Sequence, residues 1–368
     1  MTILGIETSC DETAIAVLDI NSPEDITVRA NIVSSQIKLH AEFGGVVPNL
    51  AAREHVKNIN HVFETALKTA GIIDFATEVD LIAVTHGPGL GPALLVGIAF
   101  AKTIAMIHKK PLIGVDHMRG HVYSNWLPDK NYELRITNYE KTFPILNLIV
   151  SGGHTELVLM NDYESFKLIG ETMDDAVGEA FDKVARLLGL GYPGGPQISA
   201  RAEIWKQEER SKKKGIEFPR PMIHSKDYNF SFSGLKTAVL YKIRDLKKEG
   251  VEITGDIINE IAHAFQEAAT EVLIQKTIQA AREHGVSSIL LSGGVSANTL
   301  LRNNLRTATE KAGLIFSCPP LAYTGDNAAM IALAGYFAYK ETGSADPDAS
   351  VRASWQSVDM QPNLGFRD

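Results

Sequence analysis

Residues 3–19, ILGIETSCDETAIAVLD, place two β-rich runs on either side of a polar turn, Thr8–Glu12. This pattern predicts a β-hairpin with a polar tip. It returns in the middle of the chain, where Ile145–Val150 and Thr155–Met160 flank the polar turn Ser151–His154. The sequence therefore contains the same hairpin-first unit twice.

Each hairpin is followed by a predicted strand, a glycine-bearing loop and a helix. The first half has Val79–Thr85, Gly87–Gly91 and Ala93–His108, and the second has Ser288–Leu291, Ser292–Gly294 and Ala297–Lys311. The repeat predicts an α/β fold of the duplicated actin-like class, which includes sugar kinases, Hsp70 and actin, with two related domains around a cleft. A single doubly wound sheet with ordinary βα loops is the alternative.

This repeat suggests the domain boundaries. We expect an N-terminal actin-like domain over residues 1–115, a C-terminal one with inserted helices over 116–342, and a loose tail over 343–368. Leu127–Phe143 is polar and is interpreted as a surface loop or linker. The charge run Lys206–Lys214 predicts a solvated helix end.

Composition narrows the class of protein. The 368 residues are 45% hydrophobic and include only two cysteines, Cys10 and Cys318, which excludes a disulfide scaffold and a tetracysteine zinc site. The chain opens directly into a strand-like run, and its longest apolar stretches, such as Ala93–Ile107, are too short to span a bilayer. We therefore expect a cytoplasmic enzyme.

The net charge is −8, from 36 basic and 44 acidic residues. A nucleic-acid binder that works alone normally has a basic face. If this protein acts on RNA, the favourable charge must be local or must come from a partner.

His117 and His121 are the clearest candidates for metal ligands. Their i, i+4 spacing places two imidazoles on one face of a helix. The chain has 11 histidines, so about a third of such a pair is expected by chance, and two histidines that cap or pack a helix are the alternative. Met118 stands where a zinc protease of the H-E-x-x-H type has its glutamate, so a metalloprotease would lack its base.

Several glycine turns are candidate ligand sites. Gly87–Gly91 follows a strand and precedes a helix, so its backbone N–H groups could face an anion, although it fits neither a Walker A loop nor a Rossmann motif. Ser151–Gly153 and Ser292–Gly294 follow apolar strands, and glycine there lets a sugar or phosphate approach the backbone. Tyr192–Pro196 is a further turn of this kind. A plain structural turn is the alternative for each.

The acidic candidates lie in two kinds of place. They are Glu7, Asp11, Glu12, Asp182 and Asp326. The first three are expected at an exposed hairpin tip. Asp326 precedes the apolar stretch Ala328–Tyr339 and by itself resembles a helix N-cap.

These motifs together resemble a known family, the tRNA N6-adenosine threonylcarbamoyltransferases of the bacterial and organellar type, formerly described as O-sialoglycoprotein endopeptidases. The resemblance runs from Gly5 to about Tyr339. It is carried by Gly5–Thr13, His40–Arg53, Gly87–Gly91, the His117/His121 pair, Val150–His154, Gly178–Leu190, Tyr192–Pro196, Ser231–Thr237, Ser292–Asn298 and Gly325–Asn327.

The resemblance implies an actin-like fold and a set of site residues. It implies one divalent metal ion per subunit, Fe²⁺ in preference to Zn²⁺, held by His117, His121 and Asp326. It implies that the nucleotide, threonylcarbamoyl-AMP or ATP/AMP, lies in the cleft against Ile149, Val150, Ser151, Gly152, Gly153, Asp182, Gly195 and Asn298. Asp11 or Glu12 would orient or deprotonate the attacking amine.

The implied reaction is metal-dependent acyl transfer. The threonylcarbamoyl group passes from threonylcarbamoyl-AMP to N6 of adenosine 37, in tRNAs that read codons beginning with A, and AMP is released. The implied partners are tRNA, a related actin-like subunit and a P-loop ATPase, with no membrane. An ATP-dependent small-molecule kinase on the same fold and a non-catalytic scaffold subunit are the rival hypotheses.

The chain departs from the family pattern at three places. Arg119 stands between the two histidines where the family often has Glu. The Leu127–Phe143 loop is longer than usual. Ala353-Ser354-Trp355 replaces the common C-terminal Pro-Arg-Trp.

Overall fold

Residues 1–128, 142–207, 215–341 and 355–366 are described by a computed structural model of the chain. They fall into two units, each with its own sheet. Unit 1 comprises Met1–Tyr139, Asp162–Phe166 and Cys318–Asp368, and unit 2 comprises Glu140–Asn161 and Lys167–Ser317. Unit 1 thus includes residues 116–127 and 318–341, which the sequence-based boundaries assign to the second domain.

The sheet of unit 1 has five strands in the order β3-β2-β1-β4-β5. The strands are β1 (Thr2–Glu7), β2 (Glu12–Ser22), β3 (Asp25–Ser35), β4 (Leu81–Gly87) and β5 (Leu112–Asp116). β1, β2 and β3 form antiparallel hairpins, whereas β1, β4 and β5 are parallel. The carboxyl ends of β1, β4 and β5 therefore meet at one edge of the sheet.

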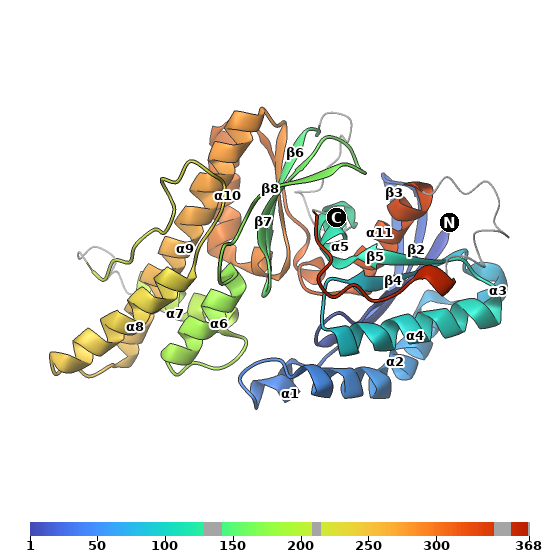
Figure 1. Cartoon of the computed structure of the whole chain (residues 1–368), viewed down its shortest axis with the longest axis horizontal. Coiled ribbons are helices and arrows are strands. Elements are labelled where there is room, and N and C mark those ends of the chain that lie inside the picture. Colours follow the sequence, from blue (N-terminus) through green and yellow to red (C-terminus); the bar gives the residue numbers. More distant parts are fainter. Residues whose placement is uncertain (129–141, 208–214, 342–354, 367–368) are drawn as a thin grey trace. The chain divides into compact units, whose positions relative to one another are not determined.

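Unit 1 also contains several α-helices. They are α1 (Ile37–Ala41), α2 (Pro48–Ala70), α3 (Phe75–Glu78), α4 (Gly91–His108), α5 (His117–Tyr123) and α11 (Ala328–Glu341). α2 and α4 lie side by side (Figure 1), and their apolar side chains form a core cluster with Leu4, Ile6, Ile15 and Val17 of the sheet. α4 is long and apolar enough to cross a membrane by length and composition alone, and within unit 1 it packs on β4 and α2.

α11 packs directly on β1, β2, β4 and β5. The close approach depends on Gly5, because a Cβ built there would lie 2.2 Å from the carbonyl oxygen of Ala328. Real Cβ atoms do not approach a carbonyl this closely. Gly5 therefore lets the first turn of α11 lie against the end of β1, close to Glu7.

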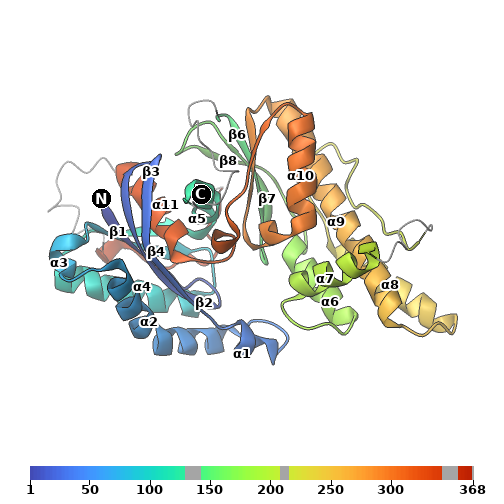
Figure 2. The ribbon, with the colours of Figure 1, turned by 180° about the vertical axis from the view of Figure 1, so that it is seen from behind.

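The sheet of unit 2 has the order β10-β9-β6-β7-β8. Its strands are β6 (Ile145–Val150), β7 (Thr155–Met160), β8 (Phe166–Glu171), β9 (Ser288–Ser292) and β10 (Ile315–Ser317). Its helices are α6 (Val177–Leu187), α7 (Gly194–Gln207), α8 (Ser233–Lys248), α9 (Gly255–His284) and α10 (Thr299–Lys311). α9 packs on α7, α8 and α10, as Figure 2 shows from behind.

The predicted repeat is confirmed at the level of the sheets. β6 and β7 form an antiparallel hairpin, and β9 is parallel to both β6 and β10. Read from the outer hairpin strand, the order β8-β7-β6-β9-β10 matches β3-β2-β1-β4-β5. The chain is thus a two-domain α/β protein with two mixed sheets.

The expected loose tail is wrong for residues 355–366. Val358 is buried in the unit 1 core, and Phe366 stacks on Phe166 with the ring centroids 5.5 Å apart. The backbone N–H of Gln361 donates to the carbonyl of His86 over 2.7 Å. These contacts join residues far apart in sequence, so helical or strand periodicity does not reveal them. Residues 129–141 of the expected linker, 208–214 of the charge run and 342–354 of the tail lie outside the described residues.

Candidate active site

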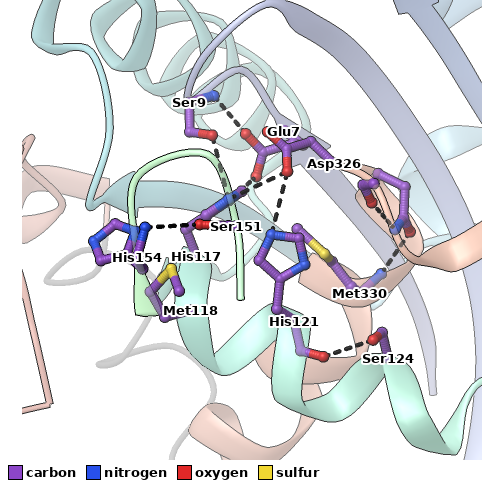
Figure 3. A network of polar contacts seen from close by, with 12 residues as sticks. Glu7, Ser9, His117, Met118, His121, Ser124, Ser151, His154, Asp326 and Met330 are labelled. Carbon is purple, nitrogen blue, oxygen red and sulfur yellow. Dashed lines mark hydrogen bonds and ion pairs between the residues drawn. The ribbon is translucent and has the colours of Figure 1, made fainter. Parts of the chain in front are cut away.

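Two histidines of α5 face a carboxylate from the loop before α11. α5 begins where β5 ends, because the Asp116 side chain accepts hydrogen bonds from the amides of Met118 and Arg119, over 2.7 and 3.1 Å. His117 and His121 then lie one turn apart on the same face of the helix. Their Nε2 atoms lie 3.4 and 3.2 Å from Oδ1 of Asp326 (Figure 3).

Asp326 is not the cap of α11, in contrast to the interpretation of its sequence context taken alone. The side chain of the next residue, Asn327, accepts a hydrogen bond from the Met330 amide over 3.1 Å. Asn327 thus performs the capping, and the Asp326 carboxylate faces the two histidines. The candidate ligand atoms of His117, His121 and Asp326 all lie within 4.8 Å of one another.

Glu7, the last residue of β1, holds His117 from the other side. Its fully buried carboxylate accepts hydrogen bonds from Nδ1 of His117 over 3.0 Å, from the Thr85 hydroxyl over 2.5 Å, and from the Ser9 amide. The expectation that Glu7 belongs to an exposed hairpin tip is therefore wrong. Because Nδ1 donates to Glu7, Nε2 of His117 is directed toward His121 and Asp326.

The electrostatics of this cluster favour positive charge. Burial lowers the pKa of His117, but the carboxylates of Glu7 and Asp326 outweigh burial and hold it well above the usual value. Burial raises the pKa of Asp326, but His117 and His121 outweigh that effect and hold it well below its usual value. Two imidazoles and one carboxylate with a second carboxylate behind them form a donor set that fits a divalent cation.

The turn Cys10–Glu12 is also partly buried. Asp11 is 8% exposed, and the Ser35 hydroxyl donates to the Glu12 carboxyl over 2.9 Å. Burial, followed by the charges of Asp326 and Asp11, raises the pKa of Glu12 to about 9. Burial, Asp11 and Asp326 likewise raise the pKa of the Cys10 thiol well above its usual value. In the metal-free protein, this shift favours the protonated form of Glu12 at neutral pH.

Two neighbouring features have structural roles. The guanidinium of Arg119 stacks over the Phe166 ring at 4.8 Å, a cation–π contact. In the loop Gly87–Gly91, the Gly89 amide donates to the carbonyl of Pro362 over 3.1 Å, and the Leu90 amide donates to Ser9 over 2.7 Å. Those two N–H groups are thus satisfied within unit 1, contrary to the expectation that this loop faces an anion.

In unit 2, two further predicted residues, Asp182 and Asn298, make hydrogen bonds that hold local structure. Asp182 on α6 accepts a hydrogen bond from the Gly194 amide over 2.6 Å and so holds the Tyr192–Pro196 turn. Asn298 caps α10, and its amide nitrogen donates to Ser199 over 3.1 Å and to Gln266 over 2.8 Å. Asn298, Ser199 and Gln266 line a pocket of ≈ 850 Å³ between α7, α9 and α10.

The predicted glycine turns of unit 2 leave their backbone accessible. Ile149 and Val150 are the buried end of β6, and Ser151 begins the exposed turn that follows. A Cβ built on Gly152, Gly153 or Gly195 would meet no described atom within 4 Å. Gly293 has φ = 86°, and its Cβ would lie 2.3 Å from the carbonyl of Val150, so this turn requires glycine.

Comparison with known proteins identifies the family. The sequence model of the tRNA N6-adenosine threonylcarbamoyltransferases matches residues 27–333. The protein of that name from Thermosipho africanus is 49% identical over 347 residues, which cover 94% of this chain and 97% of the relative. The Bacillus cereus protein of the same name is 48% identical, with 92% of each chain covered. The chain belongs to this family. It is accordingly a transferase of the acyltransferase type.

Solved structures show the same fold at greater distance. HypF from T. kodakarensis has a TM-score of 0.57 at 14% identity, and the match covers 93% of this chain and 48% of HypF. A full-length HypF in the phosphate- and nucleotide-bound form has a TM-score of 0.55 at 14% identity, with 94% and 47% covered. This chain thus corresponds to about half of HypF.

Within this threonylcarbamoyltransferase, unit 1 brings together His117, His121 and Asp326. Unit 2 contains the residues that were predicted to bind the nucleotide. Sequence reasoning missed the role of Glu7. Its position offered a signal, since a charged residue at the carboxyl end of a buried parallel strand commonly lies at a functional edge.

Proposed function

We propose that this chain transfers the threonylcarbamoyl group from threonylcarbamoyl-AMP to N6 of adenosine 37, in tRNAs that read codons beginning with A, with release of AMP. The observation that carries the proposal is the cluster of His117, His121 and Asp326 in a member of this family. Its two domains adopt the duplicated actin-like fold, which the shared strand order of the two sheets supports.

His117, His121 and Asp326 would hold a divalent ion. Fe²⁺ is favoured and Zn²⁺ is the alternative, because imidazole and carboxylate ligands suit both. When bound, the ion supplies a Lewis acid for the oxygens of the substrate. Glu7 supports the assignment because its bond to Nδ1 leaves the other ring nitrogen of His117 directed at the candidate site.

The acyl transfer is balanced without another reactant. Threonylcarbamoyl-AMP is a mixed anhydride, so its carbonyl carbon is activated. The N6 lone pair forms the new C–N bond, the bond from the carbonyl carbon to the phosphate oxygen breaks, and AMP leaves. Asp11 or Glu12 orients the attacking amine or accepts the proton that N6 loses.

Unit 2 binds the adenylate. The accessible turn Ser151–Gly153, with Ile149 and Val150 before it, and Gly195 approach the nucleotide through the backbone. Asp182 maintains the turn that contains Gly195, and Asn298 presents its amide at the edge of the polar pocket. Positioning the anhydride in this way supplies much of the rate enhancement.

The chain works with partners in the cytoplasm. Phosphate contacts dominate the affinity of proteins for RNA and require Lys and Arg, whereas this chain has a net charge of −8. A related actin-like subunit and a P-loop ATPase complete the complex. Leu95, Met106 and Ile107 on α4 are exposed apolar side chains, as expected where a partner subunit binds.

The test supplies threonylcarbamoyl-AMP with unmodified tRNA and the partners but without ATP. Mass spectrometry of the nucleosides should show one round of modification, with AMP released in proportion. A strict requirement for ATP hydrolysis by this chain, or transfer of a labelled γ-phosphate to a small molecule, would instead establish the rival kinase.

A further inference from the structure

A buried chain of hydrogen bonds lies beneath the turn Cys10–Glu12 in unit 1. It passes through His40 at the end of α1, Gln36 just before α1 and His55 on α2. The two histidines are fully buried, and Gln36 is 5% exposed. Burial of polar side chains costs free energy unless each is hydrogen-bonded, so the partners of these three residues decide what the chain can do.

The direction of these hydrogen bonds follows from groups that can only donate or only accept. The carbonyl of Ala51 accepts, so the amide nitrogen of Gln36 faces it over 3.3 Å. The amide oxygen of Gln36 consequently faces Nε2 of His40 over 3.1 Å, and His40 must have its proton on Nε2. Its Nδ1 accepts from the Val47 amide over 3.3 Å, so His40 is neutral.

His55 has the same tautomer for the same reason. The carbonyl of Cys10 can only accept, so Nε2 of His55 donates to it over 3.0 Å. Nδ1 then accepts from the Thr13 hydroxyl over 2.8 Å and, more weakly, from the Gln36 amide over 3.4 Å. Burial lowers the pKa of His55, which agrees with a neutral ring. The hydrogen bonds therefore all run in one direction: the Val47 amide donates to His40, His40 to Gln36, Gln36 to His55, and His55 to the carbonyl of Cys10.

This series of hydrogen bonds ends on the turn that carries Asp11 and Glu12. His55 holds the carbonyl of Cys10, and the backbone N–H of Gln36 donates to the carbonyl of Asp11 over 2.9 Å. Two successive carbonyls of the turn are thus fixed from the side of α1 and α2. Fixing both carbonyls fixes the peptide planes, and with them the directions of the side chains of Asp11 and Glu12.

We propose that Gln36, His40 and His55 are positioning residues of the transfer site, which set the direction of Asp11 and Glu12 through the carbonyls of Cys10 and Asp11. This inference rests on the proposed function. None of the three touches the reacting atoms. Their contribution is to keep the two carboxyls aimed when the amine attacks, and a misplacement of about 1 Å at such a site costs about 100-fold in rate.

Two variants of His55 separate the hydrogen bond at Nε2 from those at Nδ1. His55→Gln places an amide donor near the position of Nε2 and keeps the bond to the Cys10 carbonyl. His55→Asn reaches only the position of Nδ1 and loses that bond. His61→Asn on the exposed face of the same helix is the control. In the complete complex with threonylcarbamoyl-AMP and tRNA, we expect kcat to fall about 100-fold in His55→Asn and less than about fivefold in His55→Gln.

The constants for the adenylate and the metal content separate this role from general damage. KM for threonylcarbamoyl-AMP and bound metal should stay at the wild-type level in both variants. Equal losses in His55→Gln and His55→Asn, or a loss of kcat that follows the loss of metal, would overturn the proposal. If His55→Asn does not fold, Gln36→Met replaces it, with an expected fall in kcat of about tenfold. An unchanged kcat in Gln36→Met would also overturn the proposal.

The wild-type assay and a spectroscopic measurement keep the two hypotheses apart. Failure of the wild-type complex to modify tRNA refutes the proposed function. Long-range ¹H–¹⁵N spectra of the histidine rings test the chain itself, and His40 and His55 should both show a neutral ring protonated on Nε2. A proton on Nδ1 of either ring would break the derived direction and overturn the inference even if the wild type is active.

Discussion

Replacing Glu7 by Gln should weaken metal binding although Glu7 is not one of the proposed ligands. The carboxylate of Glu7 accepts hydrogen bonds from three donors: the Ser9 amide, the Thr85 hydroxyl and Nδ1 of His117. A Gln side chain is nearly isosteric but has one acceptor oxygen instead of two. Whichever way its amide is turned, it places an NH₂ group against the Ser9 amide or against His117.

The size of the effect can be worked from this geometry. If the amide NH₂ faces His117, the ring loses the acceptor that holds its orientation, and the charge that favours a cation at the site is removed as well. Loss of such a supporting group typically lowers metal affinity about 10- to 100-fold, which corresponds to about 1.4–2.8 kcal/mol. We therefore expect this range for Zn²⁺ and, under anaerobic conditions, for Fe²⁺.

Competition with a chromophoric chelator measures the affinity directly and requires no tRNA or partner. Thr85→Val is the matched control, because it removes one hydrogen bond of Glu7 and leaves the bond to His117. Its affinity should stay within about threefold of the wild type. In metal-free Glu7→Gln, the pKa of His117 should also fall, since a carboxylate that raises it is gone. A folded Glu7→Gln protein with wild-type affinity would refute the supporting role.

Three further outcomes are expected. His117→Ala and His121→Ala should each lose bound metal and transfer while circular dichroism shows a folded protein; full metal occupancy in both would refute the ligand assignment. The purified chain alone should bind tRNA poorly at physiological salt in a filter or mobility-shift assay, and tight binding would contradict the need for partners. The pKa of Glu12 is raised from 4.5 to about 9, so the metal-free protein should lose stability as the pH rises through that window. Urea titrations at several pH values give the slope of the unfolding free energy against pH, which should differ between the wild type and Glu12→Gln. Identical slopes would contradict the raised pKa.

The sequence predicted those features that depend on neighbouring residues. Both hairpins, the later strand of each half (β4 and β9) and the helices α4, α10 and α11 follow from alternating or helical patterns within short windows. The i, i+4 spacing of His117 and His121 likewise placed both on one face of α5. Asp326 joined them only through the family resemblance, because its immediate surroundings are equally typical of a helix cap.

The features that the sequence did not reveal depend on contacts between distant segments. Glu7 is adjacent to a polar turn in sequence, but β4 and α5 bury it completely by supplying Thr85 and His117. Residues 355–366 show no helical or strand periodicity. Gln361 donates to the carbonyl of His86, the carbonyl of Pro362 accepts from the Gly89 amide, and Phe366 stacks on Phe166. Residues 355–366 have no local signature, and the only signal for Glu7 is its position at the end of a buried strand, because tertiary pairing rather than propensity determines both.

The parallel strands explain why these groups meet. β1, β4 and β5 lie next to one another and point the same way, so Glu7, Thr85 and Asp116 all come at or near one edge of the sheet. Asp116 starts α5 at that edge, which places His117 beside Glu7. Gly5 allows α11 to approach β1, and the loop before α11 then delivers Asp326 from the other direction. The cluster is therefore a consequence of strand order together with one missing Cβ. β1 carries Glu7, α5 carries both histidines, and the loop that carries Asp326 is tied to the start of α11 by the bond from the Met330 amide to Asn327.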